Sequence, residues 1–269
     1  MIKLIAIDID GTLLNSQQEL TRTVKGAIKE AVETGIKIVF STGRPWTGID
    51  TYVKQIGLEK EDDFAITLNG ALVLKTNTQE DVYSNPLKHE DLAELQQIGE
   101  NLELTFAYFD KLDYLHTGKA NSMIKYDAEV MNMRLIQQEI DLIPFEQLIY
   151  KAQYVGDASQ IEALIQLIPK ELKERYYMVL TAPEVFEILA KGVSKAEALK
   201  KLINHLEIDA TEVMAIGDGL NDLDMLELVG SPVAMGNAEP EVKKIATYLS
   251  KSNEENGVAY AIRKWALEQ

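Results

Sequence analysis

The sequence predicts an α/β fold with a parallel sheet, plus an inserted α+β domain. Short apolar runs at residues 3–7 and 36–40 alternate with helical stretches, and the same alternation returns after residue 190. Near-continuous apolar strands joined by helices indicate a parallel sheet that is covered on both faces. The middle of the chain contains paired strands instead, which indicates a second domain of different architecture. We therefore expect a first domain of residues 1–84 and 191–269 and an inserted domain of residues 85–190.

The elements of the first domain follow from the position of their apolar runs and punctuating residues. Before the insertion, the sequence predicts strands at 3–7, 36–40 and 64–67 and helices at 21–33 and 45–56. Gly35 ends the first of these helices, and Pro45 suits the first position of the second. After the insertion, we expect a helix at 195–206, a strand at 213–216, a helix at 221–229, a strand at 232–235 and a last helix ending near Trp265.

The inserted domain is expected to be built from hairpins. Residues 104–108 and 112–116 form a predicted hairpin around Asp110 and Lys111, and residues 178–181 and 186–189 form another around Pro183. A strand at 152–155 and a helix at 160–168 lie between them. Turn residues between apolar runs are typical of such strand pairs.

Composition excludes several classes of function. The chain of 269 residues has 27 basic and 43 acidic side chains, and its formal net charge of −16 disfavours nucleic-acid and membrane surfaces. It has no cysteine, which excludes disulfides and thiolate metal sites. No apolar run approaches the roughly 20 residues that span a bilayer. We expect a cytoplasmic protein, monomeric or homodimeric, that binds neither nucleic acid nor membranes.

Two carboxylates follow the first predicted strand directly, in the run Asp8-Ile9-Asp10-Gly11-Thr12. In extended backbone, residues two apart point the same way, so both carboxylates can face one pocket. Such a pair repels itself unless a cation or a shared proton compensates. An acidic turn at a strand end is the simpler interpretation, but Gly11 and Thr12 after an apolar run favour a functional one.

Polar residues follow the second and the fourth predicted strands too. Ser41-Thr42-Gly43-Arg44 can present a hydroxyl and backbone N–H groups to phosphate oxygens, or can form an ordinary helix start. Gly217-Asp218-Gly219-Leu220-Asn221-Asp222 crowds carboxylates and an amide into one turn. Oxygen ligands of this kind suit Mg²⁺, although one of them is expected to cap the helix. Because ligands bind beyond the carboxyl ends of strands in open α/β sheets, these segments are expected to form one site.

Taken in order, these segments resemble the four motifs of Cof-type phosphatases in the haloacid dehalogenase (HAD) superfamily. The third motif would be Lys195, which from its position alone reads as a surface lysine at a helix start. Residues 67–71 also match a stretch typical of Cof-type members, whereas Ala196 replaces the glycine that many relatives have after the lysine. The resemblance covers the whole chain and implies a Rossmann-like core with a C2-type cap.

The resemblance also implies roles for individual residues. Asp8 would be the nucleophile and Asp10 the general acid and base. A Mg²⁺ ion would be held by Asp8, by the backbone carbonyl of Asp10 and by Asp218, with Asp222 and Arg44 in support. The phosphate-binding residues would be Ile9, Thr42, Gly43, Lys195 and Asn221.

The implied function is hydrolysis of a small-molecule phosphate ester, with sugar phosphates expected and flavin mononucleotide or pyridoxal phosphate left open. One alternative is a phosphomutase of the same superfamily, which would need additional basic residues in the cap. Only scattered ones are present there: Lys111, Lys119, Lys125 and Arg134. A second alternative is a non-catalytic phosphate or metal sensor. The intact set of acids and the lysine argues against it.

Overall fold

The computed structural model describes residues 1–268, which divide into two compact units. The first unit contains Met1–Gly43, Asp50–Tyr83 and the described chain from Ser194 onwards, and the second contains Arg44–Ile49 and Ser84–Val193. Residues 44–49, which the sequence-based boundaries put in the first domain, thus group with the second unit. There, Thr47 Oγ1 donates a hydrogen bond to the carbonyl of Met131 at 2.8 Å.

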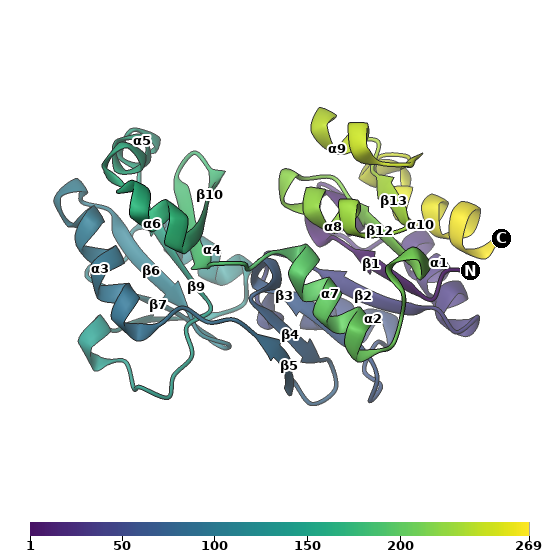
Figure 1. Cartoon of the computed structure of the whole chain (residues 1–269), viewed down its shortest axis with the longest axis horizontal. Coiled ribbons are helices and arrows are strands. Elements are labelled where there is room, and N and C mark those ends of the chain that lie inside the picture. Colours follow the sequence, from purple (N-terminus) through teal and green to yellow (C-terminus); the bar gives the residue numbers. More distant parts are fainter. Residues whose placement is uncertain (269) are drawn as a thin grey trace. The chain divides into compact units, whose positions relative to one another are not determined.

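An eight-stranded sheet forms the centre of the first unit, in the order β14-β13-β12-β1-β2-β3-β4-β5 (Figure 1). The strands from β14 to β3 are parallel, and β4 is antiparallel to β3. Their bounds are β1 Leu4–Ile7, β2 Lys37–Ser41, β3 Phe64–Thr67, β4 Leu72–Lys75, β5 Asp81–Ser84, β12 Val213–Gly217, β13 Ser231–Ala234 and β14 Tyr248–Leu249.

Helices cover this sheet, and every residue of β1, β3 and β12 is buried. The helices α7 and α8 pack against each other, with α7 against β3 and β4 and α8 against β12 and β13; α1 packs against β2 and α10 (Figure 1). Their bounds are α1 Arg22–Glu33, α2 Asp50–Ile56, α7 Lys195–His205, α8 Leu223–Leu228, α9 Pro240–Ile245 and α10 Gly257–Ala261. The predicted parallel sheet with both faces covered is therefore confirmed.

The order of the strands creates a switch point at β1. From β1 the chain continues to β2 and β3 on one side, whereas β12, on the other side, leads to β13 and β14. The connections that leave β1 and β12 therefore diverge, and open α/β sheets bind ligands beyond the carboxyl ends of their strands at such a point. Asp8 and Asp218 are the first residues beyond these two strand ends.

A six-stranded sheet forms the second unit, in the order β10-β11-β9-β6-β7-β8. All its neighbouring strands are antiparallel except β7 and β8. The strands are β6 Thr105–Phe109, β7 Asp113–His116, β8 Arg134–Gln137, β9 Lys151–Val155, β10 Tyr176–Ala182 and β11 Val185–Ala190, and the helices are α3 His89–Gly99, α4 Ser122–Val130, α5 Ala158–Leu167 and α6 Lys170–Arg175. The predicted hairpins β6–β7 and β10–β11 are both present.

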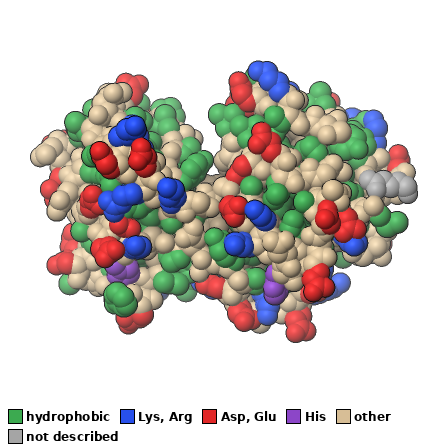
Figure 2. Space-filling view, viewed as in Figure 1, with side chains coloured by type: hydrophobic (Ala, Val, Ile, Leu, Met, Phe, Trp, Pro, Cys, Tyr) green, Lys and Arg blue, Asp and Glu red, His purple; other side chains and the backbone are tan. Residues whose placement is uncertain are grey.

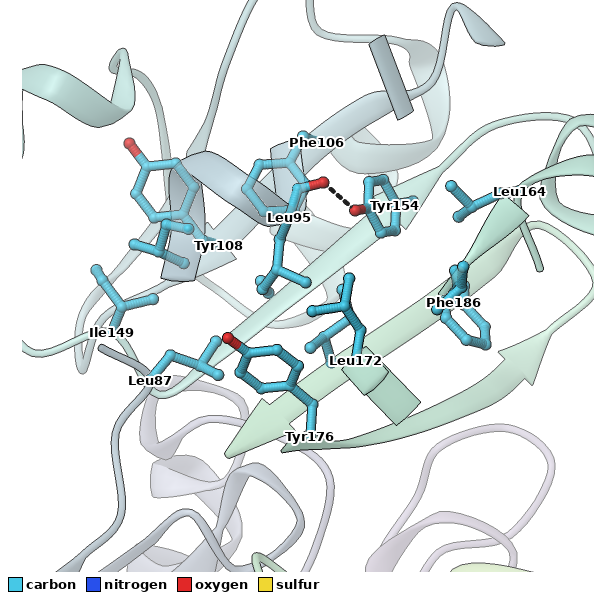
Figure 3. Close-up of a cluster of buried hydrophobic side chains, with 14 of the residues drawn as sticks. Leu87, Leu95, Phe106, Tyr108, Ile149, Tyr154, Leu164, Leu172, Tyr176 and Phe186 are labelled. Carbon is cyan, nitrogen blue, oxygen red and sulfur yellow. Dashed lines mark hydrogen bonds between the residues drawn. The ribbon is translucent and has the colours of Figure 1, made fainter. Parts of the chain in front are cut away.

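An apolar core joins this second sheet to its helices. Phe106, Tyr154 and Phe186 from the strands pack with Leu95 of α3 and Leu164 of α5 (Figure 3). The buried hydroxyl of Tyr154 donates a hydrogen bond to the carbonyl of Leu95, which satisfies its polar group inside the cluster (Figure 3). The second unit thus has a core of its own, as a separate domain requires.

One predicted helix is interrupted, and several elements were not predicted, among them strands β4 and β5. The predicted helix at 45–56 is broken into a short turn at Trp46–Gly48 and the helix α2, which begins at Asp50. Strands β4 and β5 were not predicted, because the left-handed residues Leu68–Gly70 reverse the chain after β3.

Among residues 1–268, no helix combines the length and the apolar character that a membrane span needs. Figure 2 shows acidic and basic side chains interspersed over the visible face.

Candidate active site

The turn after β1 holds the first candidate residues. The backbone N–H of Asp8 donates to the carbonyl of Ile216 at 3.0 Å, which ties the turn to the end of β12. Leu13 N donates back to Asp8 O at 3.2 Å and closes a wide loop over residues 8–13. Gly11 has a φ of +79°, and a Cβ atom there would lie 2.3 Å from Oδ2 of Asp218. Only glycine therefore allows this turn to lie so close to the second acidic loop.

A buried lysine joins two of the predicted acids. Nζ of Lys195 lies 2.5 Å from Oδ1 of Asp8 and 2.7 Å from Oδ1 of Asp222. The three side chains come from the first residue of α7, the end of β1 and the turn after β12. Their side chains are 1%, 7% and 0% exposed. Lys195 is therefore a buried cation between two carboxylates, not the surface lysine that its position alone suggested.

Asp222 is held on both of its oxygens. Oδ1 accepts the hydrogen bond from Lys195, and Oδ2 accepts from the backbone N–H groups of Asp218 and Gly219, each at 3.0 Å. These bonds satisfy a buried charge and shape the acidic loop. Asp222 is thus placed to orient both Lys195 and the loop.

The carboxylate of Asp218 is held by two neutral side chains. Oδ1 accepts a hydrogen bond from Thr12 Oγ1 at 2.7 Å, and Oδ2 accepts one from Asn237 Nδ2 at 3.3 Å. Asn237 Nδ2 also donates to the carbonyl of Gly11 at 2.8 Å. Both contacts connect Asp218 to the turn after β1, so hydrogen bonds join the two acidic loops.

Burial and mutual repulsion determine the ionisation of these acids. Burial, followed by repulsion from Asp222, raises the pKa of Asp8 well above its usual range, although Lys195 opposes this. Burial also raises the pKa of Asp218 to about 6. For Lys195, burial favours the neutral amine, but the carboxylates of Asp222 and Asp8 outweigh it and raise the pKa of the ammonium. Lys195 therefore remains charged, while the acids favour a bound cation.

The donor set fits a hard divalent cation. One carboxylate oxygen from each of Asp8, Asp218 and Asp222 lies within 4.8 Å of the others. Oxygen ligands of this kind are those that Mg²⁺ prefers, and a cation would relieve the repulsion that raises the pKa of Asp8 and of Asp218. Asp222 also accepts the hydrogen bonds of Lys195 and of two backbone N–H groups.

The polar loops after β2, β3 and β12 meet next to these acids. Thr42 N donates to Ile66 O at 3.0 Å, and Asn69 N donates to Thr42 O at 2.9 Å. The amide of Asn221 donates to Oδ1 of Asn69 at 3.2 Å. A Cβ on Gly43 would lie 3.1 Å from the same Oδ1. Thr42, Gly43 and Asn221, predicted separately as phosphate ligands, thus share Asn69 as a common neighbour.

The three remaining predicted residues, Ile9, Asp10 and Arg44, have surroundings that differ from one another. Ile9 is buried, whereas Asp10 is exposed and contributes to raising the pKa of Asp218. The sequence suggested similar surroundings for the two acids, because residues two apart in extended backbone point the same way. In the structure their exposure differs, since Asp8 is buried and Asp10 is exposed. Arg44 groups with the second unit, where its Nη1 donates to the carbonyl of Gly48 at 3.3 Å.

Sequence reasoning missed the roles of Thr12, Asn69 and Asn237. Thr12 and Asn69 lie in the segments 8–12 and 67–71, but their residue types do not show which neighbours they bind. Asn237 is close to Asp218 in the fold and nineteen positions away in the chain. The only local signal is its place just after the predicted strand at 232–235, at the same edge of the sheet as the other site residues.

This arrangement defines an α/β enzyme with its site at the switch point of a parallel sheet. A family model described as haloacid dehalogenase-like hydrolase matches residues 5–262. The chain belongs to this family, and the resemblance of its motifs to the HAD superfamily is confirmed.

Individual relatives support the same assignment. The protein named "Putative phosphatase YxeH" from Bacillus subtilis is 40% identical over 268 residues, covering 99% of each protein. The 5-amino-6-(5-phospho-D-ribitylamino)uracil phosphatase YcsE of the same organism is 32% identical, covering 99% of this chain and 96% of that protein. The crystal structure of a haloacid dehalogenase-like hydrolase from Bacteroides thetaiotaomicron superposes with a TM-score of 0.90 at 29% identity, covering 98% of this chain and 99% of that one.

Proposed function

We propose that this chain is a Mg²⁺-dependent phosphatase that hydrolyses small phosphorylated metabolites through an aspartyl-phosphate at Asp8. The observation that carries the proposal is the buried contact of Lys195 with Asp8 and Asp222, next to Asp218. It combines a nucleophile, a fixed positive charge and cation ligands at one edge of the sheet. The phosphatases among its full-length relatives support the reaction class.

The reaction would proceed in two displacements at phosphorus. In the first, an oxygen of Asp8 bonds to phosphorus, the ester bond breaks, and Asp10 gives its proton to the departing oxygen. In the second, Asp10 takes a proton from water, the water oxygen bonds to phosphorus, and the bond to Asp8 breaks. Free phosphate and the original carboxylate result. The exposure of Asp10 suits a group that exchanges protons with both the leaving alcohol and water.

Mg²⁺ bound by Asp8, Asp218 and the backbone carbonyl of Asp10 would supply positive charge that favours the ionised form of Asp8 and balances the phosphoryl oxygens. Asp222 and Thr12 orient the groups around it through their hydrogen bonds. The ammonium of Lys195 stays charged and is held 2.5 Å from Asp8, so it can stabilise negative charge as phosphorus is attacked.

The remaining polar groups would hold the transferring phosphoryl group. The backbone of Ile9, the hydroxyl and backbone of Thr42, the backbone of Gly43 and the amide of Asn221 can donate hydrogen bonds to its oxygens. Thr42 and Asn221 are connected through Asn69 in the structure, which supports their acting on one group.

Sugar phosphates are the proposed substrate class. We infer from the motifs a resemblance to the sugar phosphatase YidA. The name of YcsE specifies a substrate whose phosphate sits on a ribityl chain, which is a reduced sugar. Both point to a phosphate ester of a polyhydroxylated carbon chain.

A screen of phosphorylated metabolites, with and without Mg²⁺, tests this function. We expect release of free phosphate from one or more sugar phosphates, dependence on Mg²⁺, and no turnover by Asp8→Asn. Asp10→Asn should slow the hydrolysis of alkyl phosphates far more than that of an activated aryl phosphate, because aryl oxides leave without a proton. An isomerised sugar phosphate without free phosphate would indicate a phosphomutase instead. Absence of hydrolysis across the screen would contradict the proposal.

A further inference from the structure

The side chain of Asn69 lies where three loops of the candidate site meet. It follows β3, it is 7% exposed, and its backbone adopts the left-handed conformation, with φ +55° and ψ +27°. Asparagine tolerates this conformation better than most residues with a Cβ. The next residue, Gly70, packs so closely against the carbonyl of Ser194 that a Cβ atom would not fit there.

Backbone and side chain of Asn69 contact different loops. Its N–H donates to Thr42 O at 2.9 Å and so fixes the loop after β2. Its Oδ1 accepts a hydrogen bond from Asn221 Nδ2 at 3.2 Å and lies against Gly43. Asn221 is exposed and lies in a short turn before α8. The hydrogen bond to Asn69 therefore restricts an amide that would otherwise rotate in solvent.

We infer that Asn69 is a positioning residue for phosphate binding, which acts by orienting the amide of Asn221; this inference rests on the proposed function. Asn69 accepts a hydrogen bond from one N–H of the Asn221 amide. This bond fixes the orientation of the amide, and with it the direction of the second N–H. A donor that is oriented before the phosphoryl group arrives loses less freedom on binding it. Asn69 thereby couples the loop at Thr42 and Gly43 to the loop at Asn221.

The substitution Asn69→Gly separates the side chain from the backbone. Glycine adopts the left-handed conformation without strain and keeps the N–H that donates to Thr42. Only the amide is lost, so we expect no loss of folding. Glu207→Gly is the matched control. Glu207 is also left-handed, with φ +55°, but it is exposed and follows the C-terminal end of α7.

Binding of inorganic phosphate in Mg²⁺, measured by calorimetry, and steady-state kinetics on an aryl phosphate give the readouts. Loss of one hydrogen bond that orients a ligand group should raise the Kd of phosphate and the KM about threefold to tenfold. The affinity for Mg²⁺ and the kcat should change less, since the inferred role of Asn69 is to orient a donor to the phosphate and not to hold the cation or the nucleophile. Glu207→Gly should leave every one of these values as in the wild type.

A double-mutant cycle with Asn221→Ala tests whether Asn69 acts through Asn221. We expect Asn69→Gly to have no further effect on phosphate affinity once the Asn221 amide is gone. An equal loss in both backgrounds would overturn the inference, as would wild-type phosphate affinity in Asn69→Gly. If the wild-type enzyme neither hydrolyses esters nor binds phosphate, the proposed function itself is wrong; if it does both while Asn69→Gly is unchanged, only the role of Asn69 is wrong.

Discussion

The ammonium of Lys195 lies 2.7 Å from Oδ1 of Asp222, and both side chains are almost completely excluded from solvent. Because Asp222 also accepts two backbone hydrogen bonds, the lysine is anchored to the loop that carries Asp218. The same ammonium reaches Asp8. One buried cation therefore fixes the relative position of the two loops from which the proposed chemistry arises.

We predict that Lys195→Met lowers kcat/KM by about a hundredfold to a thousandfold, since it removes a preorganised positive charge. It should also lower the free energy of unfolding by about 3 kcal/mol, because Asp8 and Asp222 remain buried without their partner. Lys195→Arg should not match the wild-type activity, because a planar guanidinium differs in shape and donor geometry from the ammonium that contacts both carboxylates. Steady-state kinetics and urea unfolding measure both effects. Wild-type turnover by Lys195→Met would contradict the proposed role.

The raised pKa of Asp218 predicts how the stability of the metal-free protein depends on pH. The pKa is about 6 in the fold, against an ordinary value of 3.8. The folded state therefore favours the protonated acid, and its contribution to stability is lost as the pH rises from about 4 to about 6. Asp218→Asn cannot ionise. In EDTA it should be more stable than the wild type at pH 7, by about 1 kcal/mol after allowance for partial exposure.

Urea unfolding in EDTA at several pH values tests this sign. The stability advantage of Asp218→Asn should shrink towards pH 4, where the wild-type acid is protonated and therefore also neutral. In the presence of Mg²⁺ the order should reverse, because the wild type alone gains stability from the bound ion. A difference in stability that does not vary with pH would show that burial of Asp218 does not control its ionisation.

Gly11 allows a prediction about the geometry of the cation ligands. Gly11→Ala would place a Cβ 2.3 Å from Oδ2 of Asp218 and force a residue with a side chain into a φ of +79°. We expect the affinity for Mg²⁺ to fall at least about tenfold, as the carboxylate is displaced, and stability to fall by about 1 kcal/mol.

Gly35→Ala is the matched control for this substitution. Gly35 has a φ of +90°, but no atom lies within 4 Å of the position that its Cβ would take. It should cost similar stability through backbone strain and leave the affinity for Mg²⁺ unchanged. Calorimetric titration with Mg²⁺ distinguishes the two variants. Equal affinities in both would show that contact with Asp218 is not what requires glycine at position 11.

A buried ion pair in the second unit gives a prediction on stability alone. Nζ of Lys151 lies 2.6 Å from Oε1 of Glu187 and 4.4 Å from the centre of the Phe109 ring. Lys151→Met should lower the free energy of unfolding by about 3–5 kcal/mol, since Glu187 stays buried without its cation. The double variant Lys151→Met with Glu187→Leu should recover most of the loss. Unfolding followed by circular dichroism gives both values, and additive losses would contradict this account.

The strands that carry the site could be predicted from the sequence because they are short apolar runs buried on both faces. The predicted strand at 64–67 coincides with β3, and those at 3–7 and 213–216 differ from β1 and β12 by single residues. Polar residues at the ends of such strands had to converge once the sheet was parallel. This is why the contact of Asp8 with the loop of Asp218 and Asp222 could be expected before any coordinates.

What could not be predicted depends on tertiary contacts. The turn at Leu68, Asn69 and Gly70 has three successive left-handed residues, which propensities do not reveal for leucine, and it led to the missed strands β4 and β5. The burial of Lys195 depends on two carboxylates from other strands, not on its own helix. Thr12 and Asn237 donate hydrogen bonds to Asp218 although both are far from it in the sequence, so the order of the chain does not reveal these contacts.

In the proposed mechanism, Asp8 itself becomes phosphorylated. Wild-type enzyme mixed with substrate and Mg²⁺, quenched in acid within milliseconds and digested, should contain a phosphoryl group on the peptide that carries Asp8. Asp8→Asn should lack it, and Asp10→Asn should accumulate it with an activated aryl phosphate, since its second step is slowed. Rapid hydrolysis with no phosphorylated Asp8 at any quench time, or full turnover by Asp8→Asn, would contradict the account.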